Sequence, residues 1–365
     1  MTRRADMVHT NLPAICVEPE ISFREAIARI DQNGLGIVLV TDAERRLLGT
    51  VTDGDVRRSI LASVSLDAPV AAILASKAGS RYARATTVRP GTDRDTCVRL
   101  MRSHGILHLA VLDEQERVAG VIRLHDFAPE RSLESLRAVV MAGGIGSRLR
   151  PLTDETPKPM LPIGDRPLLE IIIGQLREVG IKQVKVATHH KAEKIVEHFG
   201  DGQGFGVELS YVTEDRPMGT AGSLGLIEPP TATTLVVCGD ILTQVDYRAL
   251  VSYHRGHQAD LTLVVRPHDL QVPYGVIDCE GPEVRRLREK PVLNFFVNAG
   301  IYLLEPSVFA YIPKGRRCDM TDLIQSLLEA RRRVISFPIH EFWLDIGQHA
   351  QYQQAQEQVK TWRTP

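Results

Sequence analysis

The sequence lacks a long hydrophobic run and lacks an excess of either charge. No stretch approaches the ~18 apolar residues that a membrane-spanning helix needs, and the start, MTRRADMVHTNLPAICV, is basic but has no apolar signal-peptide core. The 44 Lys and Arg residues nearly balance the 45 Asp and Glu residues, giving a formal net charge of -1 and arguing against general binding to nucleic acid or to membrane surfaces. We therefore expect a cytoplasmic protein with no nucleic-acid partner and no membrane partner.

Cysteine is scarce and scattered. Its number is odd and no pair forms a CxxC motif, so we expect free thiols in a reducing compartment rather than disulfides or zinc ligands. The pair His254 and His257 has HxxH spacing, but it lies on a polar predicted helix, which favours a solvated face over zinc. The five cysteines are Cys16, Cys97, Cys238, Cys279 and Cys318.

The length of 365 residues predicts two or three domains, and the first third of the chain contains an internal repeat. The segment GLGIVLVTDAERRLLGTVTDGDV, which starts at Gly34, corresponds without gaps to GILHLAVLDEQERVAGVIRLHDF from Gly105. Each copy has the pattern of an apolar strand, a charged turn, a second strand and a helix that begins at the final Asp. We expect the two copies, residues 1–63 and 64–127, to pack face to face.

The repeat resembles a tandem pair of CBS domains, and GTVTDGDVRRSIL is its more typical half. The resemblance implies a cleft for an adenine or guanine nucleotide, with Thr52 and Asp55 of the G-x-x-T-x-x-D stretch on the ribose. An Asp at a helix start can accept two ribose hydroxyls beside backbone N–H groups that suit phosphate. The second copy has Arg123 where the first has Thr52, which leaves Asp126 as its candidate ligand. The alternative, that Asp55 and Asp126 only cap helices, stays open.

A linker and an α/β region follow the repeat. Residues 128–137, APERSLESLR, are short and polar, as in a linker, and residues 138–365 follow as one domain. Strands and helices alternate in this domain, which predicts a mostly parallel sheet covered by helices on both faces. We expect strands over 183–188 and 207–212, helices from 168 to Gly180 and over 192–198, 221–226, 320–332 and 348–361, and a strand-rich part after Tyr274.

The stretch MAGGIGSRLRPLTDETPKPM has the composition of a phosphate-binding loop. It follows an expected strand and precedes an expected helix, the context in which backbone N–H groups hold phosphate. Gly146 is not followed by the Lys-Ser/Thr of a P-loop, and Leu149 occupies the third glycine position of a dinucleotide fingerprint. Instead Arg148 provides a donor fork, and Lys158 provides a point charge between two prolines. The loop therefore predicts phosphate binding by another scheme and disfavours an NAD-dependent oxidoreductase.

The loop resembles the signature G-G-x-G-[ST]-R-L-x-P-L-T, followed by P-K-P, of the sugar-1-phosphate nucleotidyltransferases. The resemblance extends over about residues 137–360, where PMGTAGSL, VVCGDIL, YGVI, EKP, NAGIY and WLDIG occur in the expected order. It implies a Rossmann-like, GT-A-like domain. It also implies a reaction in which a phosphate oxygen of a sugar 1-phosphate attacks the α-phosphorus of a nucleoside triphosphate (NTP) and expels pyrophosphate. Such a transfer depends mainly on in-line positioning and on charge neutralisation.

The same resemblance gives individual residues a role. Asp240, at the carboxyl end of an apolar strand, and Asp345 are the candidate ligands of Mg²⁺, which prefers one or two carboxylates together with substrate phosphates. Arg148 and Lys158 would stabilise the triphosphate, and Lys290 the sugar phosphate. For EKP the alternative is a surface ion pair of little energetic value. The candidate nucleotide-binding residues are Ala142, Gly143, Gly144, Gly146, Ser147, Glu214, Asp215 and Gly219, and the candidate sugar-binding residues are Gly275, Glu289 and Asn298.

The nucleobase and the sugar are less well defined. Guanine offers two adjacent donors that a carboxylate such as Glu214 or Asp215 accepts together, whereas uracil and thymine offer one, which favours GTP. PKPMLPIGDRPLLE is similar to the mannose-1-phosphate guanylyltransferase-like branch. CBS units before such a domain resemble the glucosamine-1-phosphate guanylyltransferases of legionaminic acid synthesis, which favours glucosamine 1-phosphate or a related hexosamine.

Several alternatives stay open at this point. They are mannose or heptose 1-phosphate with GTP, a glucose or other hexose 1-phosphate with UTP or dTTP, and an inactive nucleotide-sensing protein. The retained charged residues argue against loss of activity. We also expect a homo-oligomer that forms through the CBS units, the catalytic domains or both.

Overall fold

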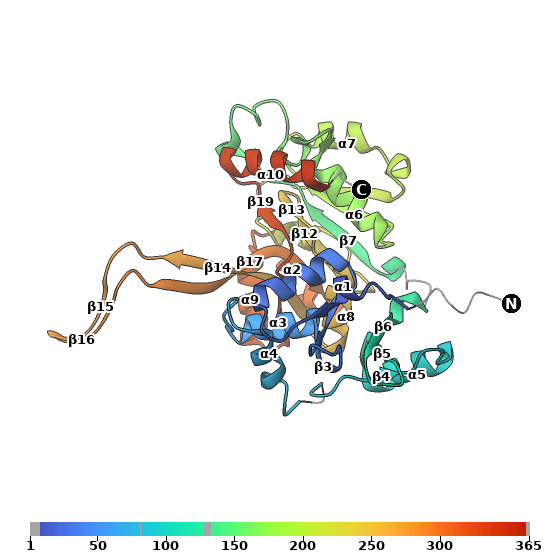
Figure 1. Cartoon of the computed structure of the whole chain (residues 1–365). Coiled ribbons are helices and arrows are strands. Elements are labelled where there is room, and N and C mark those ends of the chain that lie inside the picture. Colours follow the sequence, from blue (N-terminus) through green and yellow to red (C-terminus); the bar gives the residue numbers. More distant parts are fainter. Residues whose placement is uncertain (1–7, 81, 128–132, 363–365) are drawn as a thin grey trace. The chain divides into compact units, whose positions relative to one another are not determined.

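The computed structural model divides the chain into two compact units, residues 1–131 and 132–365 (Figure 1). The structure describes residues 8–80, 82–127 and 133–362. Residues 128–132 of the expected linker lie outside these ranges. No helix within them is both long enough and apolar enough to cross a membrane.

The N-terminal unit consists of two similar halves, each built on a three-stranded sheet. In each half a short strand pairs in parallel with the first of two antiparallel strands, in the orders β1-β2-β3 and β4-β5-β6. The strands are β1 (Cys16–Val17), β2 (Ile37–Thr41), β3 (Leu47–Thr52), β4 (Thr87–Val88), β5 (His108–Leu112) and β6 (Val118–Arg123). The helices are α1 (Leu12–Ile15), α2 (Phe23–Asn33), α3 (Asp53–Leu61), α4 (Val70–Ser76), α5 (Arg94–His104) and the 3-10 helix η1 (Leu124–Asp126).

The two halves pack face to face through their longer strands, as the repeat predicts. Ile37 of β2 lies in one buried cluster with Ala110 of β5 and Val121 of β6. The ring Nε2 of His108 lies 2.8 Å from the carbonyl oxygen of Leu35, which adds a polar contact between the halves. Each square ångström of apolar surface removed from water contributes about 25 cal/mol, so the shared cluster stabilises the pairing.

The helix after the second strand differs from the expectation in both halves. Helix α3 begins at Asp53 rather than at Asp55, because Thr52 caps it and Asp55 completes the capping box from the third helical position. In the second half the helix is a single 3-10 turn that ends at Asp126. Helix α4 packs against the core of the first half, although the second repeat is expected to start at residue 64.

A seven-stranded sheet with the order β11-β10-β7-β12-β17-β14-β18 forms the centre of the C-terminal unit. Only β17 runs antiparallel to its neighbours among these strands, which confirms the predicted mostly parallel sheet. The seven are β7 (Arg137–Met141), β10 (Gln183–Thr188), β11 (Glu208–Thr213), β12 (Thr234–Cys238), β14 (Leu261–Gln271), β17 (Val292–Leu304) and β18 (Val334–Pro338). Shorter strands pair beside it: β8 (Pro162–Ile163) with β9 (Arg166–Pro167), and β13 (Ile241–Thr243) with β19 (Trp343–Asp345).

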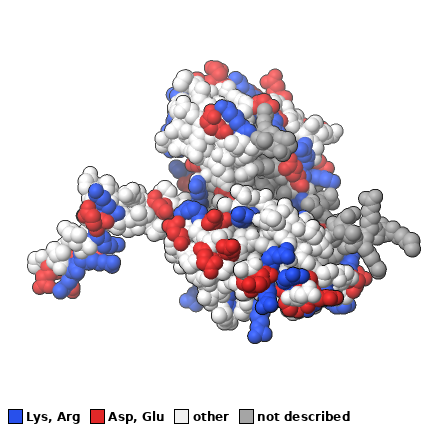
Figure 2. Space-filling view, viewed as in Figure 1, with Lys and Arg blue, Asp and Glu red and all other residues white. Residues whose placement is uncertain are grey.

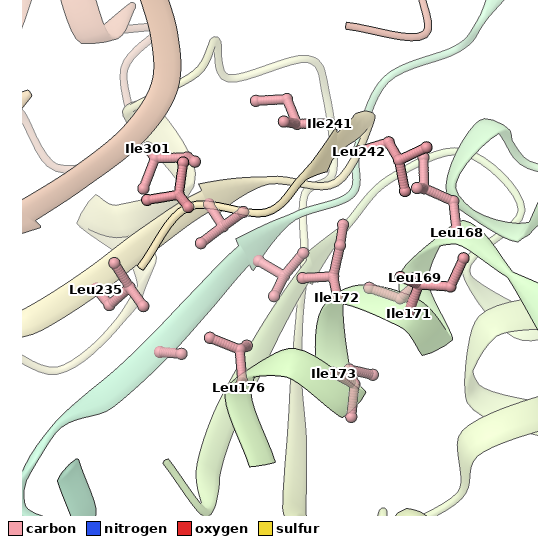
Figure 3. Packing of buried hydrophobic residues seen from close by; sticks show 14 of the residues in the cluster. Leu168, Leu169, Ile171, Ile172, Ile173, Leu176, Leu235, Ile241, Leu242 and Ile301 are labelled. Atoms are coloured by element: carbon pink, nitrogen blue, oxygen red, sulfur yellow. The ribbon is translucent and has the colours of Figure 1, made fainter. Parts of the chain in front are cut away.

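Helices cover both faces of this sheet. In β7, Val140 lies in the buried cluster that contains α6, whereas its neighbour Val139 lies in the cluster that contains α9. Helix α6 buries six aliphatic side chains, which belong to the same buried cluster as Leu235, Leu242 and Ile301 (Figure 3). Each fully buried aliphatic side chain contributes roughly 1.5–3 kcal/mol, so α6 is a firm support for the strands that carry the site. The helices are α6 (Leu168–Glu178), α7 (Ala192–Phe199), α8 (Tyr247–Gly256), α9 (Met320–Glu329) and α10 (His349–Trp362).

Two segments expected to be α-helical form only short 3-10 turns. Helix η6 (Gly222–Leu226) occupies 221–226, where two glycines lower the helix propensity. Helix η3 (Ser147–Leu149) follows the glycine loop, and Pro151 prevents its continuation. The loop therefore has no long helix whose dipole would attract phosphate. The remaining 3-10 helices are η2 (Leu133–Ser135), η4 (Lys158–Met160), η5 (Gln203–Phe205) and η7 (Pro306–Tyr311).

Strands β14 and β17 continue beyond the sheet as a two-stranded ribbon. The last pairing between β14 and β18 is at Val265, and from Arg266 onward β14 pairs with β17 alone. The ribbon ends in the hairpin β15 (Val276–Glu280) and β16 (Glu283–Arg288). Figure 1 shows this arm, residues 266–297, projecting from the rest of the C-terminal unit. The hairpin and β17 form the strand-rich part that the sequence predicts after Tyr274.

Candidate active site

The glycine loop leaves the carboxyl end of the central strand β7. The N–H group of Ala142 donates to the carbonyl oxygen of Ala187 at 2.7 Å, which fixes the start of the loop. Gly146 has a φ of 69°, and a Cβ there would lie 2.9 Å from Cγ2 of Thr153. The Thr153 hydroxyl donates to the Gly146 carbonyl oxygen at 2.9 Å. Only glycine satisfies both the left-handed backbone and the close approach at residue 146.

The other loop residues are arranged to expose the backbone. A Cβ at Gly143 would lie 3.3 Å from Oε1 of Glu214, whereas a Cβ at Gly144 would meet no atom within 4 Å. Ser147 and Arg148 are exposed. An open backbone next to an exposed guanidinium is suited to phosphate oxygens.

Lys158 forms the centre of a charged cluster with two aspartates. Its residue is buried, yet Nζ lies 2.6 Å from Oδ2 of Asp240 and 3.9 Å from Oδ1 of Asp345. The prolines on both sides hold Lys158 in η4, so the ammonium group is placed by a stiff segment.

Strand pairing brings the two aspartates together although they are far apart in the sequence. Asp240 follows the buried strand β12, and Asp345 ends β19. In the β13–β19 pair Asp345 lies opposite Ile241, and the N–H group of Ile346 donates to the Asp240 carbonyl oxygen at 2.9 Å. The cluster therefore sits at the carboxyl edge of the parallel strands, where ligands of such sheets bind.

Electrostatics within the cluster favour an added cation. Burial raises the pKa of the Asp345 carboxyl, the charge of Asp240 raises it further, and Lys158 and Arg148 only partly oppose this. A Cβ at Gly347 would lie 3.5 Å from Nη2 of Arg148 and 3.6 Å from Oδ1 of Asp345, so the guanidinium is close to this carboxylate. One lysine thus faces two carboxylates at close range.

The donor set fits a magnesium ion held jointly with substrate. Among the residues that the structure describes, no group of three or more His, Cys, Asp and Glu side chains could enclose a metal. Two carboxylates without such a cage are what Mg²⁺ uses when water and phosphate oxygens complete its octahedron. Asp240 and Asp345 are 35% and 51% exposed, which leaves their oxygens accessible.

Cys238 lies next to this cluster but is not a nucleophile. Burial raises the pKa of its thiol to about 12, and the charges of Asp240 and Asp345 contribute to the rise. The reactive thiolate form is therefore rare at neutral pH.

Glu214 is buried, and one of its carboxylate oxygens is committed to the protein. Its Oε2 accepts a hydrogen bond from the N–H group of Met218 at 2.9 Å, and its own N–H donates to the Thr188 carbonyl oxygen at 2.8 Å. Oε1 remains on the side of Gly143. Asp215 is exposed, so it is more accessible to a nucleobase than Glu214.

Gly219 is explained by close packing. Its φ is 81°, and a Cβ there would lie 2.6 Å both from Oδ1 of Asp319 and from the Cys318 carbonyl oxygen. Asp319 caps α9 and also accepts from the N–H group of Thr220. The PMGTAG turn is therefore docked onto the start of α9.

The segment NAGIY contributes a glycine that sequence reasoning missed. Asn298 donates to the Tyr302 hydroxyl at 2.7 Å and accepts from the Gly300 N–H at 3.0 Å. Gly300 has a φ of 70°, and a Cβ there would lie 2.5 Å from Cδ1 of Ile241 and 3.1 Å from Sγ of Cys238. Gly300 thus lets β17 pass beside the segment that carries Asp240, and the glycine inside a predicted strand was the available signal.

Three predicted residues lie away from this cluster, on the arm. Gly275, Glu289 and Lys290 are exposed, and a Cβ at Gly275 would lie 3.2 Å from Oε2 of Glu289. Asn298 lies in β17, which begins at Val292, so at about 3.3 Å per residue the start of this strand is roughly 20 Å from Asn298, and Lys290 precedes it. The structure therefore brings Arg148, Lys158, Asp240 and Asp345 together but not the EKP segment.

The candidate CBS ligands already bind protein groups. Asp55 closes the α3 capping box by accepting the Thr52 N–H at 3.0 Å, and it forms ion pairs with Lys77 at 2.9 Å and Arg58 at 2.7 Å. The Thr52 hydroxyl accepts the N–H of Asp55 at 3.4 Å. Capping therefore accounts for both side chains in this structure.

Asp126 is more accessible than Asp55. It accepts the N–H and the guanidinium of Arg123, and its Oδ2 lies 3.0 Å from Nε2 of His9. Its side chain is 14% exposed, against 2% for Asp55.

The HxxH pair differs from the expectation in one member. His254 is buried, with its ring between the Thr262 hydroxyl at 2.7 Å and Oε1 of Glu305 at 3.0 Å. His257 is exposed and stacks on Tyr253. The solvated face predicted for both residues is wrong for His254, which instead joins α8 to the sheet.

Comparison with known proteins agrees with the fold. Residues 137–361 match the nucleotidyl transferase family model, and residues 5–62 and 83–131 match the CBS domain model. The first match covers more than half of the chain, so the protein belongs to the nucleotidyl transferase family, with a pair of CBS domains in front of the family domain.

Curated relatives differ in nucleotide and sugar. The chain is 35% identical over 242 residues to the UTP--glucose-1-phosphate uridylyltransferase of Synechocystis sp., covering 60% of this chain and 62% of the relative. It is 32% identical over 220 residues to the mannose-1-phosphate guanylyltransferase of Mycobacterium tuberculosis, covering 58% of this chain and 60% of the relative. The match thus spans less than two thirds of either relative.

A solved structure from Bacillus anthracis, described as a glucose-1-phosphate thymidylyltransferase in complex with a sucrose, has the same fold. It superposes with a TM-score of 0.51 at 27% identity, over 62% of this chain and 95% of that chain.

Proposed function

We propose that this protein transfers a nucleotidyl group from an NTP to a sugar 1-phosphate and releases pyrophosphate. The observation that carries the proposal is the cluster of Lys158, Asp240 and Asp345 at the sheet edge, next to an open glycine loop. Two anionic substrates must approach each other in this reaction, so the site has to supply positive charge and fixed donors.

The chain's own residues would divide this task. Asp240 and Asp345 would hold Mg²⁺, which when bound neutralises charge on the phosphate oxygens. The backbone from Ala142 to Ser147 would position the triphosphate, while Arg148 and Lys158 would oppose the charge that develops on the pyrophosphate. No side chain forms a covalent intermediate in this scheme, in keeping with the protonated thiol of Cys238.

For the substrates we infer GTP and an amino-sugar 1-phosphate such as glucosamine 1-phosphate, the pair that fits legionaminic acid synthesis. The support for guanine is Glu214, whose Oε1 lies beside the loop at Gly143, together with the neighbouring carboxylate Asp215, since guanine offers two adjacent donors. The uridylyltransferase relative motivates UTP with a hexose 1-phosphate as the competing pair. The CBS pair would bind an adenine or guanine nucleotide and regulate turnover.

The test is a pyrophosphate-release assay with Mg²⁺, each of five NTPs (GTP, UTP, dTTP, CTP and ATP) and a panel of sugar 1-phosphates. We expect release to be fastest with GTP and a hexosamine 1-phosphate. Asp240→Asn should lower turnover by at least about 100-fold, because it removes a metal ligand and leaves the Lys158 ammonium without its nearest carboxylate. Asp67→Asn, at a carboxylate that is 82% exposed in the N-terminal unit, is the matched control and should be unaffected.

Each outcome of the panel has a consequence. Release with UTP alone would overturn the guanine assignment and keep the reaction. Absence of release with every pair, together with tight binding of an adenine nucleotide, would favour a nucleotide sensor over an enzyme.

A further inference from the structure

The arm carries an unusual share of exposed apolar side chains. Half of the exposed large hydrophobic residues in the described ranges lie between residues 270 and 296, a short part of the chain. A free two-stranded ribbon has no core in which to bury them. Figure 2 shows this part with charged side chains of both signs and uncharged surface between them. These arm residues are Leu270, Tyr274, Ile277, Val284, Leu287, Val292, Phe295 and Phe296.

The hairpin at the end of the arm has one apolar face and one charged face. Ile277 pairs with Leu287 on one face, where Val284 lies opposite a cysteine. On the other face Asp278 pairs with Arg286 and lies 3.2 Å from a neighbouring arginine. A register shift after Asp278 interrupts the alternation, but it keeps Val284 on the face of Ile277 and Leu287. A face of this kind is typical of a sheet with one side packed against protein, yet both sides of this hairpin face solvent in the single chain.

The area on offer is that of a stable protein interface. A fully exposed large side chain presents about 150–200 Å², so the eight residues, each roughly half exposed or more, present on the order of 800 Å² per arm. Stable interfaces bury about this much on each partner. Because Phe295 and Phe296 are consecutive in β17, this area is divided between the two faces of the arm. Two reciprocally docked arms would therefore reach the area of a stable dimer when each partner contacts both faces.

Regular pairing keeps the arm away from the catalytic cluster of its own chain. The ladder between β14 and β17 continues without a register shift from Arg266 opposite Val297 to Gln271 opposite Val292. To bring Lys290 back to Asn298, this ladder would have to open and lose its backbone hydrogen bonds.

The EKP segment at the base of the hairpin is nevertheless well defined. The N–H group of Val272 donates to the Pro291 carbonyl oxygen at 3.0 Å, and Lys290 has a left-handed backbone with a φ of 43°. Glu289 and Lys290 are thus displayed on an ordered turn, exposed to solvent. In the cluster itself Lys158 is already engaged by Asp240, so a cation for the sugar phosphate is needed from elsewhere.

We propose that the occupant of this apolar arm is a second copy of the chain, and that the arm of each copy completes the active site of the other. Docking would bury the apolar face of the hairpin on the partner's catalytic unit and carry Glu289 and Lys290 to the partner's Asp240 and Asp345. In that position Lys290 neutralises the sugar phosphate and Glu289 accepts sugar hydroxyls. The proposal rests on the proposed function for these roles, but the association itself does not.

The decisive experiment is complementation between two inactive variants. Asp240→Asn and Lys290→Ala are co-expressed with different tags, and the doubly tagged complex is purified and assayed for pyrophosphate release. With exchanged arms one site of the complex combines an intact cluster with an intact arm, so we expect about half of the wild-type activity. Activity at the background of the single variants, or no doubly tagged complex, would overturn the proposal.

A second complex tests the same arrangement, and for this complex arm exchange predicts loss of activity instead of recovery. Both substitutions are placed in one chain, and this double variant is co-purified with a wild-type partner. Arm exchange predicts an inactive complex, because the wild-type cluster receives the Lys290→Ala arm. If each arm serves its own chain, half of the activity is retained, and the proposal fails.

Association is measured separately, so that it does not depend on activity. By sedimentation velocity the wild type should have twice the mass of Ile277→Asp/Leu287→Asp, which places charge on the apolar face of the hairpin. Asp278→Ala/Arg286→Ala, on the opposite face, should remain dimeric. A dimer that survives the apolar-face substitutions contradicts the docking surface. A dimer that dissociates as expected in a protein without pyrophosphate release supports the interface and rejects only the proposed function.

Discussion

At the scale of single residues, Lys158 determines the charge balance of the candidate active site. It lies 2.6 Å from Asp240 and 3.9 Å from Asp345, so one positive charge faces two negative ones. The remaining negative charge, together with burial, raises the pKa of Asp345. The divalent cation proposed for this site would relieve the repulsion between the carboxylates.

A second residue-scale case is Asp55, whose role as a structural carboxylate can be tested by pH. Burial raises the pKa of Asp55, but attraction to Lys77 and the hydrogen bonds from Lys77, Thr52 and Arg58 outweigh it, and the net pKa is lowered. A carboxylate whose folded pKa is depressed stabilises the fold above its unfolded pKa of about 3.9, and the contribution disappears as pH falls through the folded value.

We therefore predict that Asp55→Asn loses about 2–4 kcal/mol of unfolding free energy at pH 7, because Lys77 remains buried without its partner. The loss should shrink as pH falls below about 4. Urea denaturation of the full chain at pH 7 and at low pH measures both values. Asp67→Asn, at a solvent-exposed ion pair, is the control and should change little. Equal midpoints for wild type and Asp55→Asn at pH 7 would rule out this role.

At the scale of elements, Gly300 is where β17 crosses the segment that carries Asp240. We predict that Gly300→Ala destabilises the protein by about 2–4 kcal/mol, since the added Cβ brings both a left-handed backbone and a clash with Ile241. Gly281→Ala is the matched control. Its φ is 59°, but a Cβ there meets nothing within 4 Å, so it should cost only about 1 kcal/mol from backbone strain. Denaturant midpoints that do not differ between the two variants would show that the crossing tolerates a side chain.

Elements with strong local patterns were the predictable ones. The aliphatic spacing from residue 168 onward predicts α6 because each apolar side chain on that helix meets the sheet. The 3-10 turns at Ser147 and Gly222 were not predictable as such, because glycine and proline permit several short conformations and tertiary contacts choose among them. For the site, strand ends explain why Asp240 and Asp345 meet. No local pattern shows that β14 and β17 remain paired past the sheet and carry Lys290 away.

At the scale of the whole molecule, the chain joins a nucleotidyl transferase domain to a pair of CBS domains. If a nucleotide in the CBS unit alters the affinity for substrate, substrate must alter the affinity for that nucleotide by the same factor. If the two domains are not coupled, neither ligand changes the affinity for the other.

The carboxylate that decides this regulation is, we predict, Asp126 rather than Asp55. Asp126 forms contacts with Arg123 and with His9. A bound nucleotide can replace both contacts, because its ribose can donate two hydroxyls to Asp126 and its phosphate can neutralise the guanidinium of Arg123. Asp55 is closed off by Lys77 and Arg58, so replacing it should act first on stability. In calorimetric titration with AMP, Asp126→Ala should bind at least about 10-fold more weakly than the wild type, by loss of charge-assisted hydrogen bonds. AMP should also shift kcat/KM in the wild type and fail to do so in Asp126→Ala. Unchanged AMP binding in that variant would show that Asp126 has only a structural role and that the second CBS half provides no carboxylate for the ribose.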